Sequence, residues 1–177
     1  MAITGLVSAM HTRASPHAAP PPGAPAFAVE RTLGRLGKWL RLLGFDTVLE
    51  TDCPHDDFIS GCAAGRILLT RTHRVLAEHG ELNPLLIRAD DPFRQIVEVA
   101  RALGLTAHAL KPFSRCLRCN DPVEALAREE ARGVVPDYVW QTQPAFSRCP
   151  RCRRVYWRGT HTARSLERVE TLLNGAP

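Results

Sequence analysis

The stretch RILLTR, residues Arg66–Arg71, has an apolar centre with an arginine at each end. A strand with one solvated face alternates apolar and polar residues, whereas a continuous apolar run is typical of a strand covered on both faces. Strands of that kind occur in parallel sheets packed between helices. The stretch therefore predicts a buried strand in an α/β fold.

Strand-like and helix-like segments alternate on both sides of this stretch. The expected strands are 26–30, 46–50, 66–71 and 84–89, and the expected helices are 31–44, 56–64, 72–80 and 91–104. Pro92 at the opening and Gly104 at the close of the last helix are the usual residues for those two positions. This alternation specifies a parallel sheet flanked by helices.

The first expected helix has an apolar side and a basic side. Its apolar residues recur at helical spacing, and Gly44 supplies a C-terminal stop. The apolar side contains Leu33, Leu36, Leu40 and Leu43, and the basic side contains Arg31, Arg35, Lys38 and Arg41. We expect the basic side to face solvent, with Arg31 and Arg35 nearest the end of the first strand.

Acidic residues stand at the carboxyl ends of the strands, where open parallel sheets bind ligands. Glu30 follows the first strand, Asp90 and Asp91 follow the fourth, and Asp56 and Asp57 open the second helix. Carboxylates gathered at one edge repel one another unless cations lie between them, so the set predicts bound Mg²⁺ or Mn²⁺. For each acid taken alone, helix capping or a solvated surface position explains its place equally well.

Two nearly identical heptads, FSRCLRC (Phe113–Cys119) and FSRCPRC (Phe146–Cys152), each contain a C-x-x-C pair. A C-x-x-C turn places two thiolates on one side of a tight knuckle, and two knuckles form a closed tetrahedral zinc site. Disulfides would require an oxidising compartment. A catalytic redox site would require a single C-x-x-C pair, whereas this chain has two. We predict a structural Zn²⁺ held by Cys116, Cys119, Cys149 and Cys152.

The cysteine-bearing segment also carries most of the positive charge. The chain has a formal net charge of +5, and residues 112–177 contribute most of that excess. Arginines cluster between Arg148 and Arg158, together with Tyr156 and Trp157 and without an acid. Such a segment attracts polyanions, and its aromatic rings suit stacking on unpaired bases. For Trp157, packing within the fold is the favoured alternative.

The chain divides into three parts on composition. Residues 1–25, rich in Pro and Ala, lack the basic start and long apolar core of an export signal, so we expect a disordered leader. Residues 26–111 form the sheet domain, and residues 112–177 form the zinc-binding part with a C-terminal helix. No apolar run approaches the roughly 18 residues of a membrane helix, so we expect a cytoplasmic protein without a membrane partner.

Several stretches together resemble a known family. They are LGRLGKWLRLLGFDT (33–47), GRILLTR (65–71), IRADDPFRQ (87–95), FSRCLRCN (113–120) and FSRCPRCRRVYWRGTH (146–161). In this order they are similar to the PIN-like ribonuclease family named for the C-terminal domain of the Mut-seven exonuclease. The resemblance implies a PIN-like parallel sheet flanked by helices, followed by a C-terminal zinc ribbon that helps to bind RNA.

The resemblance and the acid cluster together imply a metal-dependent endoribonuclease. The expected catalytic residues are Glu30, Asp56, Asp57 and Asp90, and the expected RNA-binding residues are Arg35, Arg71, Arg148, Arg151, Arg154 and Tyr156. Two positions depart from the family pattern, because Glu30 stands in place of aspartate and Thr72 in place of an acid. A catalytically decayed, nuclease-derived RNA-binding module is therefore the alternative. Asp46, at the opposite end of its strand, is expected to have a structural role.

Overall fold

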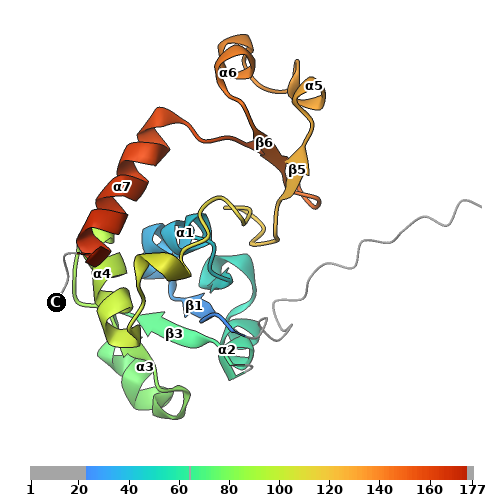
Figure 1. Cartoon of the computed structure of the whole chain (residues 1–177). Coiled ribbons are helices and arrows are strands. Elements are labelled where there is room, and N and C mark those ends of the chain that lie inside the picture. The colour runs from blue at the N-terminus through green and yellow to red at the C-terminus, as the bar shows by residue number, and fades with distance from the viewer. Residues whose placement is uncertain (1–22, 64, 175–177) are drawn as a thin grey trace, which may run out of the picture.

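The computed structural model describes residues 23–63 and 65–174, so most of the expected leader lies outside the described residues. A parallel sheet and its helices come first in the chain, and a smaller antiparallel sheet follows (Figure 1). The first part contains β1 (Phe27–Val29), α1 (Gly34–Leu42), β2 (Thr47–Leu49), α2 (His55–Ala63), β3 (Ile67–Thr70), α3 (His73–Glu78), β4 (Leu85–Leu86) and α4 (Pro92–Leu103). Short 3₁₀ turns lie at Arg31–Leu33, Glu50–Asp52, Gly80–Leu82 and Ala107–Ala109.

The four-stranded sheet is parallel throughout, in the order β2-β1-β3-β4. This confirms the predicted α/β architecture, and each expected strand is present in shorter form. The chain passes from β1 to β2 on one side and then crosses to β3 on the other side of β1. The carboxyl ends of β1 and β3 therefore form the topological switch point at which such sheets bind ligands.

Helices cover both faces of this sheet. Successive strand residues point to opposite faces, so Phe27 and Val29 join one buried cluster and Ala28 joins another. The larger cluster contains the apolar side of α1 and residues of α4. The smaller one contains Phe58 of α2 and Leu68 of β3. The predicted apolar side of the first helix is therefore buried against the sheet.

The chain's last helix also packs on this first core. Helix α7 (Thr160–Asn174) follows the second sheet in sequence but lies alongside α4 (Figure 1). Leu166 and Val169 of α7 are buried in the larger cluster. The helix that we expected within the zinc-binding part thus completes the core of the parallel-sheet part.

Arg41 corrects one expectation about the first helix. We predicted a solvated side chain, but Arg41 is only 1% exposed. Its guanidinium donates to the carbonyl of Thr47 and to the carbonyls of Leu117 and Arg118, and it pairs with Asp52. The prediction was wrong because another part of the chain, the first cysteine knuckle, packs over this side of α1.

The second sheet has three antiparallel strands in the order β5-β6-β7. They are β5 (Glu124–Leu126), β6 (Phe146–Arg148) and β7 (Val155–Tyr156), with the short helices α5 (Arg128–Ala131) and α6 (Asp137–Thr142) between β5 and β6. A separate small core lies there, with Leu126, Val139 and Phe146 at its centre and Trp157 packed against it. None of the helices within residues 23–63 and 65–174 is long and apolar enough to cross a membrane.

Candidate functional site

Glu30 stands at the switch point between β1 and β3. It directly follows β1, and its backbone N–H still donates to Leu69 of β3 at 3.0 Å. Its carboxylate accepts hydrogen bonds from the hydroxyl of Thr70 (2.5 Å), the hydroxyl of Thr72 (2.8 Å) and the backbone N–H of Arg71 (3.0 Å). The segment that follows β3 therefore holds the carboxylate of Glu30 in one orientation.

These hydrogen bonds keep Glu30 ionised. Partial burial acts to raise the pKa of Glu30, but donation from Thr70, Arg71, Thr72 and Thr32 outweighs it and lowers the pKa below the ordinary 4.5. Thr72, where the resemblance led us to expect an acid, serves as a hydrogen-bond donor to Glu30. The site contains a fixed anion at neutral pH.

Glu50 is a site residue that the sequence reasoning missed. It directly follows β2, and it lines the same cavity of about 270 Å³ as Glu30, Thr72 and His55. Its carboxylate accepts from the backbone N–H of Arg31 at 2.8 Å, and its other oxygen lies 3.2 Å from Nδ1 of His55. The signal was available, because Glu50 ends its strand in the same way as Glu30 ends the neighbouring parallel strand.

Asp56 and Asp57 lie in the first turn of α2, as expected. Asp56 lines a second cavity of about 430 Å³, and this cavity shares His55 and His79 with the Glu30 cavity. Asp57 lines neither of the two cavities. The structure thus places Asp56 beside the Glu30 site and not within it.

Asp90 and Asp91 have different partners. Asp90 is 88% exposed, and its carboxylate accepts from the guanidinium of Arg71 at 2.5 Å. Asp91 caps α4 by accepting from the backbone N–H groups of Phe93 and Arg94, each at 3.1 Å. The capping alternative is therefore confirmed for Asp91, while Asp90 is connected to Glu30 through Arg71.

The four predicted acids do not gather into one group of metal ligands. In the part of the chain that the structure describes, one group of three or more His, Cys, Asp or Glu side chains is close enough to share an ion, and it consists of the four cysteines. Three carboxylates line one cavity, those of Glu30, Glu50 and Glu78, and Glu78 pairs with Arg74 at 2.7 Å.

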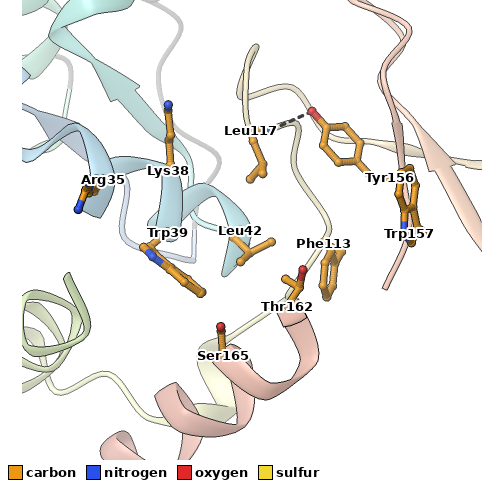
Figure 2. A pocket seen from close by; sticks show the side chains of 10 residues that line it. All are labelled: Arg35, Lys38, Trp39, Leu42, Phe113, Leu117, Tyr156, Trp157, Thr162 and Ser165. Atoms are coloured by element: carbon orange, nitrogen blue, oxygen red, sulfur yellow. Dashed lines mark hydrogen bonds between the residues drawn. The ribbon is translucent and has the colours of Figure 1, made fainter. Parts of the chain in front are cut away.

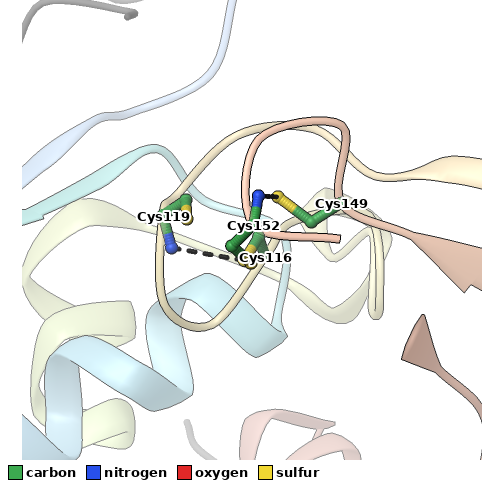
Figure 3. A group of neighbouring side chains, drawn as sticks. All are labelled: Cys116, Cys119, Cys149 and Cys152. Carbon is green, nitrogen blue, oxygen red and sulfur yellow. Dashed lines mark hydrogen bonds between the residues drawn. The ribbon is translucent and has the colours of Figure 1, made fainter. Parts of the chain in front are cut away.

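The four predicted cysteines converge from the two knuckles (Figure 3). Their sulfur atoms all lie within 4.8 Å of one another, and Sγ of Cys116 is 3.6 Å from Sγ of Cys152. A zinc tetrahedron with bonds of about 2.3 Å has sulfur–sulfur edges of about 3.8 Å. The four sulfur atoms therefore fit a single ion such as Zn²⁺.

The repeated heptads fold in the same way. In each knuckle the backbone N–H of the second cysteine points at the sulfur of the first, at 3.2 Å for Cys119 and 3.5 Å for Cys152. The residue after each pair, Asn120 or Arg153, has a positive φ of 65° or 61° and donates its N–H back to the first cysteine's carbonyl. This shared turn directs both sulfur atoms of a pair to one side.

Tyr156 is anchored at this cluster. Its hydroxyl lies 3.1 Å from Sγ of Cys116 and accepts from the backbone N–H of Leu117 at 3.2 Å. Burial acts to raise the pKa of Cys116, but donation from Tyr156 and from the knuckle's backbone N–H groups lowers it to about 7. The lowered pKa favours the thiolate at Cys116, whereas burial and the neighbouring cysteines raise the pKa of Cys119 and of Cys149.

A comparison with protein families now bears on these two sites. The model of the Mut7-C RNAse domain matches residues 25–169, which include every cysteine and acid described above. The chain belongs to the Mut7-C RNAse domain family. This confirms the resemblance and indicates a nuclease-like, RNA-related function. Searches of curated proteins and of solved structures found no match.

The arginines predicted to bind RNA lie in different settings in this Mut7-C domain. Arg35 and Arg154 are exposed, Arg148 pairs with Glu130 at 3.3 Å, and Arg151 pairs with Asp121 at 2.6 Å. Arg71 pairs with Asp90. Within the described residues, Arg35 and Arg154 are thus the predicted RNA contacts without an ion-pair partner.

Within the Mut7-C domain, Asp46 and Asn120 join the parallel-sheet part to the first cysteine knuckle. Asp46 accepts from Arg66 (3.2 Å) and from the side-chain amide of Asn120 (2.8 Å), whose own oxygen accepts from Thr47 N–H. The structural role expected for Asp46 is confirmed, and it fixes the first knuckle to the amino end of β2.

Proposed function

We propose that this protein is a metal-dependent endoribonuclease that hydrolyses RNA phosphodiester bonds at the carboxyl edge of the parallel sheet. One observation carries the proposal: Glu30 is held ionised at the switch point and shares a cavity with Glu50. Family membership supports RNA as the substrate. Divalent metal ions are the usual partners of paired carboxylates in phosphodiester hydrolysis.

The donor set fits Mg²⁺ or Mn²⁺. Mg²⁺ keeps several of its waters and is held by one or two carboxylates together with substrate phosphates, so a group of three protein ligands is not required. Glu30 and Glu50 would hold the ion from adjacent strands, with Asp56 at the neighbouring cavity as a further carboxylate. When bound, the ion would activate water and neutralise charge on the phosphate.

The surrounding residues have separate roles in this proposal. Thr70 and Thr72 keep Glu30 oriented, and Asp90 acts as a positioning residue by holding Arg71 beside it. The Glu50–His55 contact is suited to proton transfer: if Nδ1 of His55 donates to Glu50, the other ring nitrogen is free to accept a proton from the attacking water.

We further propose that the four cysteines form the centre of a zinc ribbon that holds RNA. A site with four protein ligands is closed to water, so the ion would stabilise the fold and perform no chemistry. The ribbon arginines Arg148, Arg151 and Arg154 would contact phosphates without regard to sequence. In this role Arg154 is available directly, while Arg148 and Arg151 would exchange a carboxylate for a phosphate.

A decayed, RNA-binding module is the second candidate, favoured by the separation of the predicted acids. Asp90 lies outside the Glu30 cavity, and Thr72 supplies a hydroxyl where the family pattern has an acid. On this view the chain binds RNA and does not cut it.

Cleavage of a labelled RNA by zinc-loaded protein, with and without added Mn²⁺, separates the two candidates. The nuclease proposal expects Mn²⁺-dependent cleavage that falls at least about 100-fold in Glu30→Gln and in Glu50→Gln. Glu170→Gln, an exposed carboxylate on α7, is the matched control and should retain full activity.

Thr72→Asp provides the converse test. If this variant switches on cleavage in a chain that otherwise only binds RNA, the decayed-module candidate is correct. If the unaltered chain cleaves RNA and Glu30→Gln does not, the nuclease proposal is correct.

A further inference from the structure

A cavity of about 440 Å³, separate from the Glu30 cavity, lies between α1, α7 and the end of β7. Figure 2 shows the side chains that line it. Its wall comes from helix α1, from Phe113 and Leu117 of the first heptad, from the end of β7 and from the N-terminal turns of α7. Its volume is within the roughly 300–1,000 Å³ typical of small-ligand sites. The lining residues are Arg35, Lys38, Trp39, Leu42, Phe113, Leu117, Tyr156, Trp157, Thr162 and Ser165.

Four of the lining side chains are aromatic, and contacts with neighbouring residues hold Trp39, Tyr156 and Trp157 in place. Trp39 packs against Phe93, with ring centroids 5.1 Å apart. Tyr156 is fixed through its hydroxyl by the first knuckle. Trp157 packs against the second core. A cavity with anchored rings offers preformed stacking surfaces, so a planar ligand would bind at a small cost in conformational entropy.

The charge of the cavity has one sign. Arg35 and Lys38 are exposed and lie on the same side of α1, and the cavity lining contains no carboxylate. Neither side chain has an ion-pair partner within the described residues. A ligand that places a flat ring among the aromatic residues and an anion at Arg35 and Lys38 matches both features.

We propose that this cavity binds one unpaired base of an RNA strand, with the adjoining phosphate on Arg35 and Lys38. The assignment rests on the proposed function, because RNA is the substrate class that it names. A base has a π-face whatever its identity, so the contact would be tolerant of sequence. An apolar side chain of a protein partner would use the rings but would leave both cations without a counterion.

The position of Arg35 connects this cavity to the Glu30 site. A single turn, Arg31–Leu33, separates Glu30 from the start of α1. With a rise of about 2.0 Å per residue in the 3₁₀ turn and about 1.5 Å in the helix, Arg35 lies roughly 9 Å along the chain from Glu30. A strand whose base occupies the cavity would thus lead its neighbouring phosphates toward the hydrolytic site.

Tryptophan fluorescence tests the proposal directly, since the chain has 3 tryptophans. Trp39 and Trp157 line the cavity, whereas Trp140 does not; the guanidinium groups of Arg128 and Arg132 lie 4.9 Å and 5.1 Å from the centroid of its ring. The zinc-loaded protein is titrated with oligouridylate in the absence of Mg²⁺ and Mn²⁺. Quenching should persist in Trp140→Phe and disappear in the Trp39→Phe/Trp157→Phe double variant.

An abasic oligomer of the same length separates base binding from backbone binding. It has the same phosphates without bases, so it should leave the fluorescence unquenched and bind about 10-fold more weakly, as expected for the loss of one stacking contact. Equal affinity for the two oligomers, or quenching that survives the double variant, would overturn the proposal. Either result would assign RNA binding to the arginines alone.

A blocked cavity provides a second, independent readout. Thr162→Phe fills the cavity without changing charge and should weaken binding of labelled oligouridylate by about 10-fold. Thr171→Phe, exposed on the same helix, is the matched control and should bind as the unaltered protein does. If Thr162→Phe binds normally, the cavity is not a base site. Because no step involves cleavage, a negative result here is distinct from failure of the nuclease proposal.

Discussion

Replacing Arg41 with methionine should destabilise the protein by about 3–5 kcal/mol. Methionine keeps the apolar stem and removes the guanidinium, which is 1% exposed and donates to three backbone carbonyls and to Asp52. Each hydrogen bond from a charged donor contributes roughly 1.5–3 kcal/mol, and desolvation of the guanidinium offsets part of their sum. Breaking one member of a buried ionic network typically costs about 3–5 kcal/mol.

Urea denaturation of zinc-saturated protein, followed by tryptophan fluorescence, measures the change in the free energy of unfolding. Arg35→Met is the matched control, since it removes the same group from an exposed position on the same helix and should change stability by less than about 0.5 kcal/mol. Because two of the carbonyls belong to the first knuckle, Arg41→Met should also release zinc faster. A loss below about 1 kcal/mol would refute the assignment of Arg41 as the link between α1 and the knuckle.

Three further outcomes follow from the structure. Cys116→Ser should lower the metal content from one zinc per chain to none, whereas Cys53→Ser, outside the four-sulfur group, should leave it unchanged in elemental analysis. The pKa of Glu30 is lowered from 4.5, so its ionised form adds stability that is complete above pH 4.5 and is lost as the pH falls through the lower folded value. The difference in the free energy of unfolding between the unaltered protein and Glu30→Gln should therefore shrink in that acid range. Gly44→Ala should lower the melting temperature by several degrees, because Gly44 has a φ of +97° and a Cβ there would lie 2.4 Å from a carbonyl oxygen, while Gly34→Ala, with φ −57° and open space, should not lower it.

The sheet and the cysteine group could be predicted from the sequence because local patterns specify them. The apolar centre of the stretch 66–71 predicts a buried strand without knowledge of the other elements. Each C-x-x-C turn places its two sulfur atoms by local geometry alone. The elements that failed prediction depend on distant packing. Periodicity assigned Arg41 to the polar side of its helix, but only the fold shows that the carbonyls of residues 117 and 118 cover it.

The acidic site was predictable in part. The rule that ligands gather at the carboxyl ends of strands identified Glu30, and the same rule applied to the next strand identifies Glu50. Sequence order could not show that Asp90 pairs with Arg71 outside the cavity, because strand order and side-chain direction decide which acids meet. The aromatic cavity could not be predicted from the sequence, because its walls come from four segments that are far apart in the chain.

The return of α7 to the first core makes the antiparallel sheet an insertion that is tethered at both ends. Leu166 and Val169 complete a cluster whose other buried members precede residue 100. A chain cut after residue 111 would therefore leave an apolar patch uncovered on α4 and should aggregate or unfold, even though every strand of its parallel sheet is intact. Attachment at both ends, together with the hydrogen bonds from Arg41, also limits how far the cysteine knuckles can move from α1.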